Sequence, residues 1–309
     1  MRGDSSSRRA LLRISGFGIA GPSGCLFTDS DDDQPEQHST TRQTATQTKT
    51  PAPSSTTATT KRQTTEQPIR EPTTQEQTTR EKTSDESADA KSGSVVLTFD
   101  DGLNSVYEQT FPIMKEYGFS GLSAVVCDRI EAGGSHPGEL TTGELTELQD
   151  AGWEISGHSY SKHPALADLS PSDLRWQPKR QIEWLNKHEL LADILSLVYP
   201  YNNVNESVTD ITEEFFDIGF DNLTRPKDGI DDALSVGRVK GHEPGTAKEA
   251  IAAAKNQYPT VLMYHDVTQS VQKDNDIFIK EFRETLSYID SYGSALETIT
   301  PSELYQLIR

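Results

Sequence analysis

Cysteine is scarce in this chain: its 309 residues include only two cysteines, Cys25 and Cys127. A framework of structural disulfides is therefore excluded. Cys127 follows the apolar run 122–126, so we expect a buried small side chain there and no metal ligand. Long apolar runs are also missing near the N-terminus, where the weakly apolar stretch 14–20 is too short to span a bilayer.

Basic residues are in the minority. The chain has 29 Lys and Arg against 48 Asp and Glu, a formal net charge of −19. Residues 1–93 hold 12 of the basic and 13 of the acidic residues, so 17 and 35 lie in residues 94–309. This negative charge argues against a nucleic-acid partner. With the export signal described below, it supports the hypothesis of a halophilic protein, and an ordinary acidic secreted domain is the alternative.

The composition divides the chain into three segments. Residues 28–93 are poor in large apolar side chains and rich in Thr, Gln, Ser, Glu and Pro. Such a segment cannot bury enough apolar surface to offset its chain entropy, which predicts a disordered stalk. Residues 94–309 suit one folded domain. Residues 1–27 remain as a separate leader.

The leader has the pattern of an export signal. Ser7-Arg8-Arg9-Ala10-Leu11-Leu12-Arg13 fits the twin-arginine type. Pro22-Ser23-Gly24-Cys25 resembles the lipobox of exported lipoproteins, although Pro22 replaces the usual aliphatic residue. We therefore expect twin-arginine export, a lipid on Cys25 that anchors the protein to the membrane, and a cell-surface or extracellular location. The alternative is a disordered basic start with an incidental cysteine.

Predicted strands and helices alternate through residues 94–309, which favours parallel strands with crossover helices. We expect a distorted (β/α) barrel of about seven parallel strands, with a doubly wound open sheet as the alternative. The predicted strands are 94–99, 122–126, 153–155, 195–199, 219–223, 234–239 and 260–264. The predicted helices are 106–117, 142–151, 171–191, 208–216, 247–256, 277–291 and one that begins near 301 with Thr300 as its N-cap.

Polar side chains follow the carboxyl ends of four predicted strands, where the active face of a barrel lies. Successive strand residues point to opposite faces, so the adjacent carboxylates of Asp100 and Asp101 suit two different tasks, one as cation ligand and one as proton acceptor. Each group alone also fits a loop or packing role. The four groups are 100–101, 157–163, 199–201 and 265–266.

Three of these stretches resemble motifs of the polysaccharide deacetylases, the family-four carbohydrate esterases with a NodB-like domain. Thr98-Phe99-Asp100-Asp101-Gly102 is similar to the first motif, and Val261-Leu262-Met263-Tyr264-His265 to the last. Ser196-Leu197-Val198-Tyr199-Pro200-Tyr201 resembles the third motif in the branch that carries Tyr-Pro-Tyr. The resemblance implies that Asp100 is the general base, His265 the general acid and Asp101 a metal ligand.

The resemblance also implies that His158 and His163 complete the metal site, although the family's two histidines usually have three residues between them. Here four residues intervene, and on a helix a spacing of five places side chains about 140° apart. The two histidines can share a metal only if 159–162 bulges or forms a loop. No clear fourth motif is present. Arg238 is the candidate to orient Asp100. One of Asp228, Asp231 or Asp232 is a candidate to support His265, although a solvated loop is the better interpretation of these aspartates.

The resemblance predicts metal-assisted hydrolysis of an acetamide or acetyl ester on an N-acetylated or O-acetylated extracellular polysaccharide. An Asp/His₂ ligand set suits zinc or a similar divalent ion. We expect Tyr201 and Pro200 to border the substrate, with a backbone N–H near Tyr201 on the oxyanion. The alternative is a catalytically inactive glycan-binding module, because the shifted histidine spoils its metal site.

Overall fold

The computed structural model describes residues 93–131, 138–221, 230–255 and 259–309. The predicted leader, nearly all of the predicted stalk, Cys25 and Asp228 lie outside this part, and predictions for them stay predictions. Within the described residues, none of the helices has both the length and the apolar character needed to cross a membrane.

The central element is a parallel sheet that confirms the predicted distorted (β/α) barrel. Its strands follow the order β5-β4-β3-β2-β1-β7-β6, and β10 pairs with β1 off this path. A separate short pair is formed by β8 and β9. The strands are β1 (Gly93–Phe99), β2 (Leu122–Val126), β3 (Glu154–Ser159), β4 (Ser196–Val198), β5 (Ile218–Phe220), β6 (Val239–Lys240), β7 (Thr260–Tyr264), β8 (Val267–Thr268), β9 (Ile277–Phe278) and β10 (Leu296–Thr298).

Helices connect the strands, as the alternation predicted. The α-helices are α2 (Phe111–Tyr117), α3 (Cys127–Glu131), α4 (Thr142–Asp150), α5 (Pro171–Lys187), α6 (Glu206–Thr212), α7 (Pro244–Ala254), α8 (Ile279–Asp290) and α9 (Pro301–Leu307). Single turns of other helix types are η1 (Val106–Thr110), η2 (Leu166–Asp168), η3 (Pro200–Asn202) and η4 (Gly293–Ala295).

The two edges of the sheet are linked by the segment 233–240. Val236 forms a parallel bridge with Phe220 of β5, and three residues later Val239 pairs with Leu262 of β7. One short stretch therefore contacts both sides of the barrel. This linkage excludes the doubly wound alternative, whose open sheet leaves its two edge strands apart.

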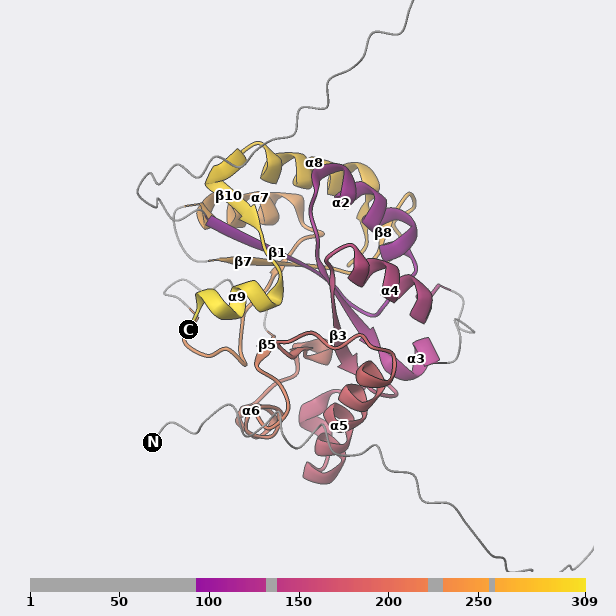
Figure 1. The fold of residues 1–309 in the computed structure, drawn as a ribbon. Helices are drawn as coiled ribbons and strands as arrows, with labels where there is room; N and C mark the ends of the chain where they lie inside the picture. Colours follow the sequence, from indigo (N-terminus) through magenta and orange to yellow (C-terminus); the bar gives the residue numbers. More distant parts are fainter. Residues whose placement is uncertain (1–92, 132–137, 222–229, 256–258) are drawn as a thin grey trace, which may run out of the picture. The chain divides into compact units, whose positions relative to one another are not determined.

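Apolar side chains of β1 alternate between two cores, because successive strand residues point to opposite faces. Val95, Leu97 and Phe99 belong to the outer core, which packs against helices including α2, α4, α7 and α8. Val96 belongs to the inner core, which also includes Leu304 of α9. In Figure 1, α2, α7 and α8 lie on one side of β1 and the yellow α9 on the other.

Helix α9 closes the amino end of the barrel. The amide of Ile299 donates to the carbonyl of Val95, and β10 pairs with β1 over Gly93–Val95. Thr300 is the N-cap, as predicted, and the structure adds a capping box with Glu303. The opposite end, where Asp100 follows β1, is not covered by α9, and we call it the open end.

Several element bounds differ from the predictions. Strands β2 and β7 agree residue for residue, but β3 extends to Ser159, so that His158 lies on the strand and not in a loop after it. Helix α5 ends at Lys187 instead of 191, because Glu189 has φ 59° and so cannot continue a right-handed helix. The predicted helix 106–117 divides at Phe111, since Pro112 has no amide hydrogen to donate.

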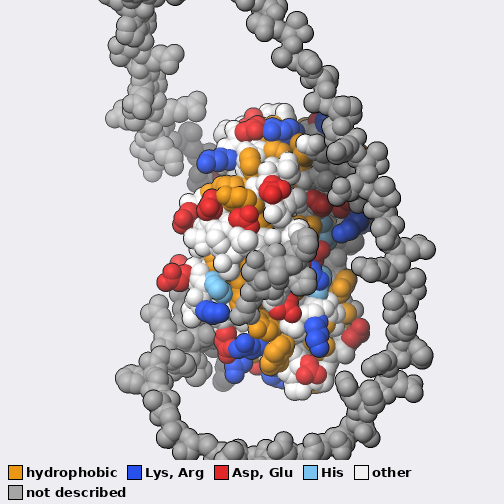
Figure 2. Space-filling view, turned by 90° about the vertical axis from the view of Figure 1, so that its right-hand side faces the viewer, with side chains coloured by type: hydrophobic (Ala, Val, Ile, Leu, Met, Phe, Trp, Pro, Cys, Tyr) orange, Lys and Arg blue, Asp and Glu red, His pale blue; other side chains and the backbone are white. Residues whose placement is uncertain are grey.

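Charged side chains are spread over the surface of the described part. On the face shown in Figure 2, acidic side chains (red) lie among basic ones (blue) and apolar ones (orange). On this face the negative charge is dispersed, and it does not gather in one acidic patch.

Candidate active site

The carboxyl end of β1 supplies two carboxylates to the open end of the barrel. Asp100 is 2 % exposed, and its amide donates to the carbonyl of Tyr264 at 2.9 Å. The chain then turns through Asp101 with φ 74° and Gly102 with φ 69°. Two successive left-handed residues redirect the chain, and glycine adopts this conformation at little cost. Asp100 is therefore fixed in the sheet, while Asp101 lies in the turn beyond it.

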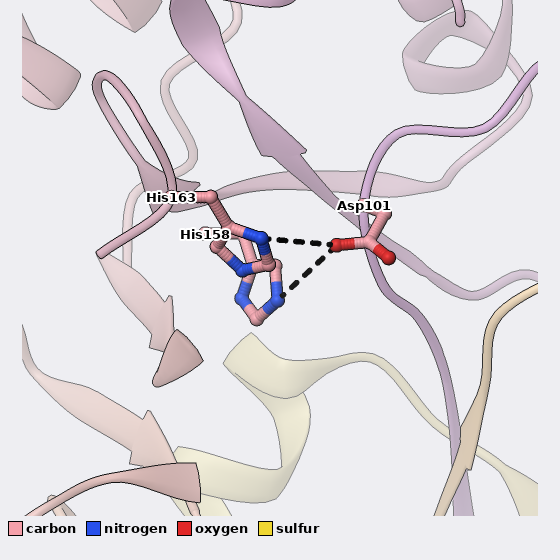
Figure 3. A group of neighbouring side chains, drawn as sticks. All are labelled: Asp101, His158 and His163. Atoms are coloured by element: carbon pink, nitrogen blue, oxygen red, sulfur yellow. Dashed lines mark ion pairs between the residues drawn. The ribbon is translucent and has the colours of Figure 1, made fainter. Parts of the chain in front are cut away.

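Asp101 faces both predicted metal-binding histidines (Figure 3). Its Oδ1 lies 3.7 Å from Nε2 of His158 and 3.6 Å from Nδ1 of His163. The two imidazole rings have centroids 4.5 Å apart, and one ligand atom from each of the three residues lies within 4.8 Å of the others. The structure thus brings together all three predicted ligands.

A β-bulge and a left-handed loop accommodate the five-residue offset. Val125 pairs with Gly157, but Val126 pairs with Ser159, so His158 is the extra residue in β3. Bulges of this kind occur at barrel rims, where they redirect a side chain. Lys162 and His163 then have φ 60° and 44°, which turns the loop back toward the strand. The loop expected for 159–162 is present, and the bulge lies just before it, at His158.

Both histidines are held in the neutral form. Nδ1 of His158 lies 2.8 Å from the carbonyl oxygen of Val198; that contact requires a hydrogen on Nδ1 and leaves the lone pair of Nε2 directed at Asp101. Burial lowers the pKa of His158. Burial, followed by the repulsion that would arise if both imidazoles were protonated, lowers the pKa of His163 to about 4. Neutral imidazoles are the form that binds metal.

The three residues fit a divalent cation. Oδ1 of Asp101, the atom that faces both histidines, is buried without a hydrogen-bond partner among the described residues. In a tetrahedral site with bonds of about 2.1 Å, ligand atoms lie about 3.4 Å from one another. The distances from Oδ1 of Asp101 to the two histidine nitrogens, 3.6 and 3.7 Å, are close to this value, and all three ligand atoms lie within 4.8 Å of one another. Carboxylate and imidazole ligands suit zinc and similar transition metals.

Arg238 binds Asp100, as predicted. Its Nη1 donates to Oδ1 of Asp100 at 2.7 Å, and its Nη2 to Oδ1 of Asn202 at 3.2 Å. Arg238 is 1 % exposed. Burial alone would raise the pKa of Asp100, but the neighbouring Arg238 and then His158 lower it to about 2. Asp100 is therefore ionised at neutral pH.

His265 lies beside Asp100 at the end of the neighbouring strand. Phe99 pairs with Tyr264 in the β1–β7 ladder, so the next residue of each strand, Asp100 and His265, continues the same register. Nδ1 of His265 is buried and has no hydrogen-bond partner in the described part of the chain. The structure thus places the predicted acid next to the predicted base.

His242 is a site residue that the sequence analysis missed. The amide of Gly241 donates to the carbonyl of Met263 at 2.8 Å, which extends the β6–β7 register and sets His242 beside His265. Burial, and then the charge of His265, lowers the pKa of His242. The sequence signal that could have identified His242 is its position just after β6 (Val239–Lys240), since polar residues that follow a strand lie at the carboxyl end of the barrel. The predicted strand ended at Val239, so His242 was not considered.

The Tyr-Pro-Tyr stretch borders the metal-binding residues. Tyr201 has φ 58° and is 66 % exposed. Its ring stacks on His163 with centroids 4.7 Å apart. Pro200 is buried, and the buried hydroxyl of Tyr199 lies 3.0 Å from Oγ1 of Thr212. Tyr199 is thus a packing residue, and Tyr201 presents an open aromatic face beside the site.

Other predicted residues lie away from this site. Asp231 and Asp232 are exposed, and Oδ1 of Asp232 accepts a hydrogen bond from the amide of Leu234. A turn role therefore explains Asp232 better than support of His265. Cys127 is fully buried, as expected for a small apolar side chain.

Comparison with known proteins agrees with this geometry over part of the chain. Residues 87–215 match a family model. That family is polysaccharide deacetylase. The match confirms the resemblance for the stretch that contains Asp100, Asp101, His158 and His163, whereas Arg238 and His265 lie beyond the matched residues.

Individual polysaccharide deacetylases share about a quarter of the aligned residues. Poly-beta-1,6-N-acetyl-D-glucosamine N-deacetylase of Staphylococcus epidermidis is 25 % identical over 122 residues, which are 37 % of this chain and 42 % of that protein. The Bacillus subtilis protein YxkH is 25 % identical over 125 residues, 39 % of this chain and 41 % of its own. The matches thus span less than half of either relative.

Solved structures were also compared. A family 4 acetyl xylan esterase from Clostridium thermocellum, in complex with cobalt, has 21 % identity and a TM-score of 0.48, and the match covers 69 % of this chain and 91 % of that one. For the Streptococcus pyogenes deacetylase PplD in complex with acetate, the identity is 23 %, the TM-score 0.43 and the coverage 47 % and 62 %.

Proposed function

We propose that residues 94–309 form a metal-dependent hydrolase that removes acetyl groups from N-acetylated or O-acetylated extracellular polysaccharide. The observation that carries this proposal is the convergence of two groups at the open end of one barrel. Asp101, His158 and His163 face one another, and the ion pair of Asp100 with Arg238 lies next to them.

Asp101, His158 and His163 would hold the divalent ion, for which zinc is our first choice. Such an ion, when bound, supplies positive charge that acidifies an attacking water and polarises the acetyl carbonyl. The hydrogen bond from His158 to Val198 fixes the ring that would bind it. Second contacts of this kind orient metal-binding histidines.

Asp100 is the proposed general base. Its pKa of about 2 keeps the carboxylate ionised, so it can accept the proton of the attacking water. Arg238 holds Oδ1 at 2.7 Å, which leaves Oδ2 as the atom for proton transfer. Burial excludes bulk water, so that the bond to Arg238 keeps one orientation.

His265 is the proposed general acid. An amine is a poor leaving group until its nitrogen is protonated, and a histidine beside the base can deliver that proton. As the carbon–nitrogen bond breaks, the electron pair goes to nitrogen and the proton comes from His265. Acetate and a free amino sugar result, and Asp100 and His265 return to their starting states by exchanging protons with solvent.

Tyr201 and Pro200 are proposed to border the acetyl group and the sugar. The exposed ring of Tyr201 offers an apolar face of the kind on which a sugar ring packs. A backbone N–H near Tyr201 would donate to the oxyanion formed at the acetyl carbon. The name of the Staphylococcus epidermidis relative supports an N-acetylated glycan as substrate.

The inactive glycan-binding alternative rested on a spoiled metal site. Because both histidines reach Asp101 despite the extra residue, that reason no longer applies. The proposal is tested by acetate release from acetylated oligosaccharides, measured with and without a chelator. Release that the chelator abolishes and added zinc restores would support it, whereas no release from any acetylated glycan would support the binding module.

Export and anchoring are a separate proposal that rests on the leader sequence alone. We propose twin-arginine export, lipidation of Cys25 and a cell-surface location, with the acidic composition as an adaptation to salt. Cys25→Ser should move the protein from the membrane fraction to the soluble one. A Cys25→Ser protein that stays in the membrane fraction would contradict the lipid anchor.

A further inference from the structure

Four consecutive backbone amides of the histidine loop point toward helix α5. They belong to His158, Ser159, Tyr160 and Ser161. In a regular strand successive amides point to alternate sides, so this arrangement depends on the bulge at His158. Each of these four amides needs a hydrogen-bond acceptor.

Two glutamines of α5 accept these four hydrogen bonds. Oε1 of Gln177 accepts from Tyr160 N at 2.8 Å and from Ser161 N at 3.1 Å. Its Nε2 donates to the carbonyl of Ser161 at 3.1 Å. With its amide oxygen turned to the strand, Gln181 accepts from His158 N at 3.1 Å and from Ser159 N at 3.0 Å.

The spacing of the two glutamines along α5 matches the spacing of the two pairs of amides in the loop. Gln177 and Gln181 are four residues apart on α5, so they lie on one face of the helix, one turn from each other. Helix α5 packs against β3, and both side chains are buried, 7 % and 1 % exposed. A glutamine oxygen has two lone pairs, and each of these oxygens therefore satisfies two amides.

Gly157 leaves the space that Gln181 occupies. A Cβ at Gly157 would lie 2.6 Å from Cδ and 3.0 Å from Cγ of Gln181, closer than side-chain contacts allow. The φ of Gly157 is not in the left-handed region, so backbone conformation does not explain this glycine. Room for the Gln181 side chain does.

We infer that Gln177 and Gln181 are positioning residues for the metal site, which hold the loop so that His158 and His163 both face Asp101. The inference rests on the proposed metal-dependent function. Gln181 fixes the bulged residue His158, and Gln177 fixes the loop that leads to His163. Without these acceptors the four amides would seek other partners, and the distance between the two imidazoles would no longer be set.

The test measures metal binding by the full-length chain, with Co²⁺ alone and Zn²⁺ alone as probes. Gln181→Leu and the double variant Gln177→Leu/Gln181→Leu keep similar side-chain volume but remove the acceptors. We expect affinity for both ions to fall roughly 10–100-fold, the usual effect of removing a group that orients a metal ligand. The visible absorption of bound Co²⁺ should change as well, because it reports ligand geometry.

Four further variants separate positioning from stability. Leu174→Ala removes a buried side chain from the same helix, and it should lower the melting temperature but leave Co²⁺ affinity within about twofold, since it keeps both acceptors. Gln306→Leu makes the same chemical change at an exposed position of α9 and should change neither quantity. Gln181→Glu keeps an acceptor oxygen and should retain most of the affinity. Gly157→Ala should reproduce the effect of Gln181→Leu.

The outcomes are distinct. Wild-type protein that binds neither ion would overturn the metal-dependent function, and the inference with it. Wild-type protein that binds both, with unchanged affinity and Co²⁺ spectrum in the glutamine variants, would overturn the inference alone. If Gln181→Leu does not fold, Gly157→Ala and Gln181→Glu decide: weak binding in the first and strong binding in the second support the inference, and equal binding overturns it.

Discussion

Arg238 and Asp100 are 138 residues apart in the chain, yet their side chains form a buried ion pair at 2.7 Å. Both side chains are at most 3 % exposed. The pair is possible because the segment 233–240 contacts both edges of the barrel, which brings Arg238 to the open end beside β1. Asp100 therefore depends on Arg238 for its counter-charge.

Removing the arginine should destabilise the protein and shift its pH profile. Arg238→Met leaves Asp100 buried without its counter-charge, which should cost roughly 3–5 kcal/mol of unfolding free energy. The pKa of Asp100 should rise, so the acidic limb of the rate profile should move to higher pH. Arg175→Met is the matched control, because its ion pair with Glu214 is half exposed and should cost less than about 1 kcal/mol. Equal losses in the two variants would contradict the prediction.

Removing a metal ligand should deplete the metal. Purified wild-type protein should hold about one transition metal ion per chain, and His158→Ala or Asp101→Ala should hold much less, since two protein ligands are too few to retain the ion. Elemental analysis after dialysis measures this content. His188→Ala provides a control, because the His188 ring packs on Trp184 and is not one of the three proposed ligands. An unchanged metal content in both variants would contradict the assignment of His158 and Asp101 as metal ligands.

Replacing the base should slow the reaction without removing the metal. Asp100→Asn keeps the size of the side chain but cannot accept the proton, so the rate should fall roughly 10²–10⁴-fold, the usual contribution of positioned proton transfer. The loss should be similar for N-acetyl glycan and for an aryl acetate, because both reactions need the activated water. Steady-state rates on the two substrates, with metal content measured beside them, check this expectation.

Replacing the acid should have an effect that depends on the leaving group. An amide nitrogen must be protonated before it leaves, whereas an aryl oxide leaves unaided. His265→Ala should therefore lose most of its activity on N-acetyl glycan and comparatively little on the aryl ester. A variant with equal losses on both substrates would leave His265 with a structural role only.

The metal-free protein should lose stability as the pH falls from 6.5 to 4. The pKa of His163 is lowered to about 4 from an ordinary 6.5, so the unfolded chain binds a proton in this range before the folded one does. Protonation then favours unfolding, and the stability present above pH 6.5 is lost as the pH approaches 4. Urea unfolding in chelator should show a weaker pH dependence in His163→Phe than in wild type. The same slope in both would contradict the assignment.

The sequence alone determined the alternation of elements and the catalytic end of the barrel. Apolar β-branched runs such as 122–126 and 260–264 specify strands locally, and their bounds were correct to the residue. Polar groups directly after such runs must lie at the carboxyl end of a parallel sheet, whatever the fold's details. This is why Asp100, Asp101 and His265 could be found without a structure.

The local sequence pattern could not predict strands that form only because neighbouring strands offer hydrogen-bond partners. β10 has three residues and was not predicted, and the predicted strand 234–239 corresponds to β6, which has only two residues. Segments this short show no period, and they are strands because β1 and β7 offer partners. His242, which follows β6, was missed for that reason.

The metal site itself was decided by tertiary structure. In the sequence, the five-residue offset of His158 and His163 was compatible with one shared metal ion or with no metal site. The residues between the two histidines did not distinguish these possibilities. The bulge at His158 and the left-handed turn at Lys162 and His163 exist because buried acceptors on α5, Gln177 and Gln181, satisfy the amides that leave the ladder. The acceptors for these loop amides lie on a helix later in the chain, so only the folded arrangement brings amide and acceptor together.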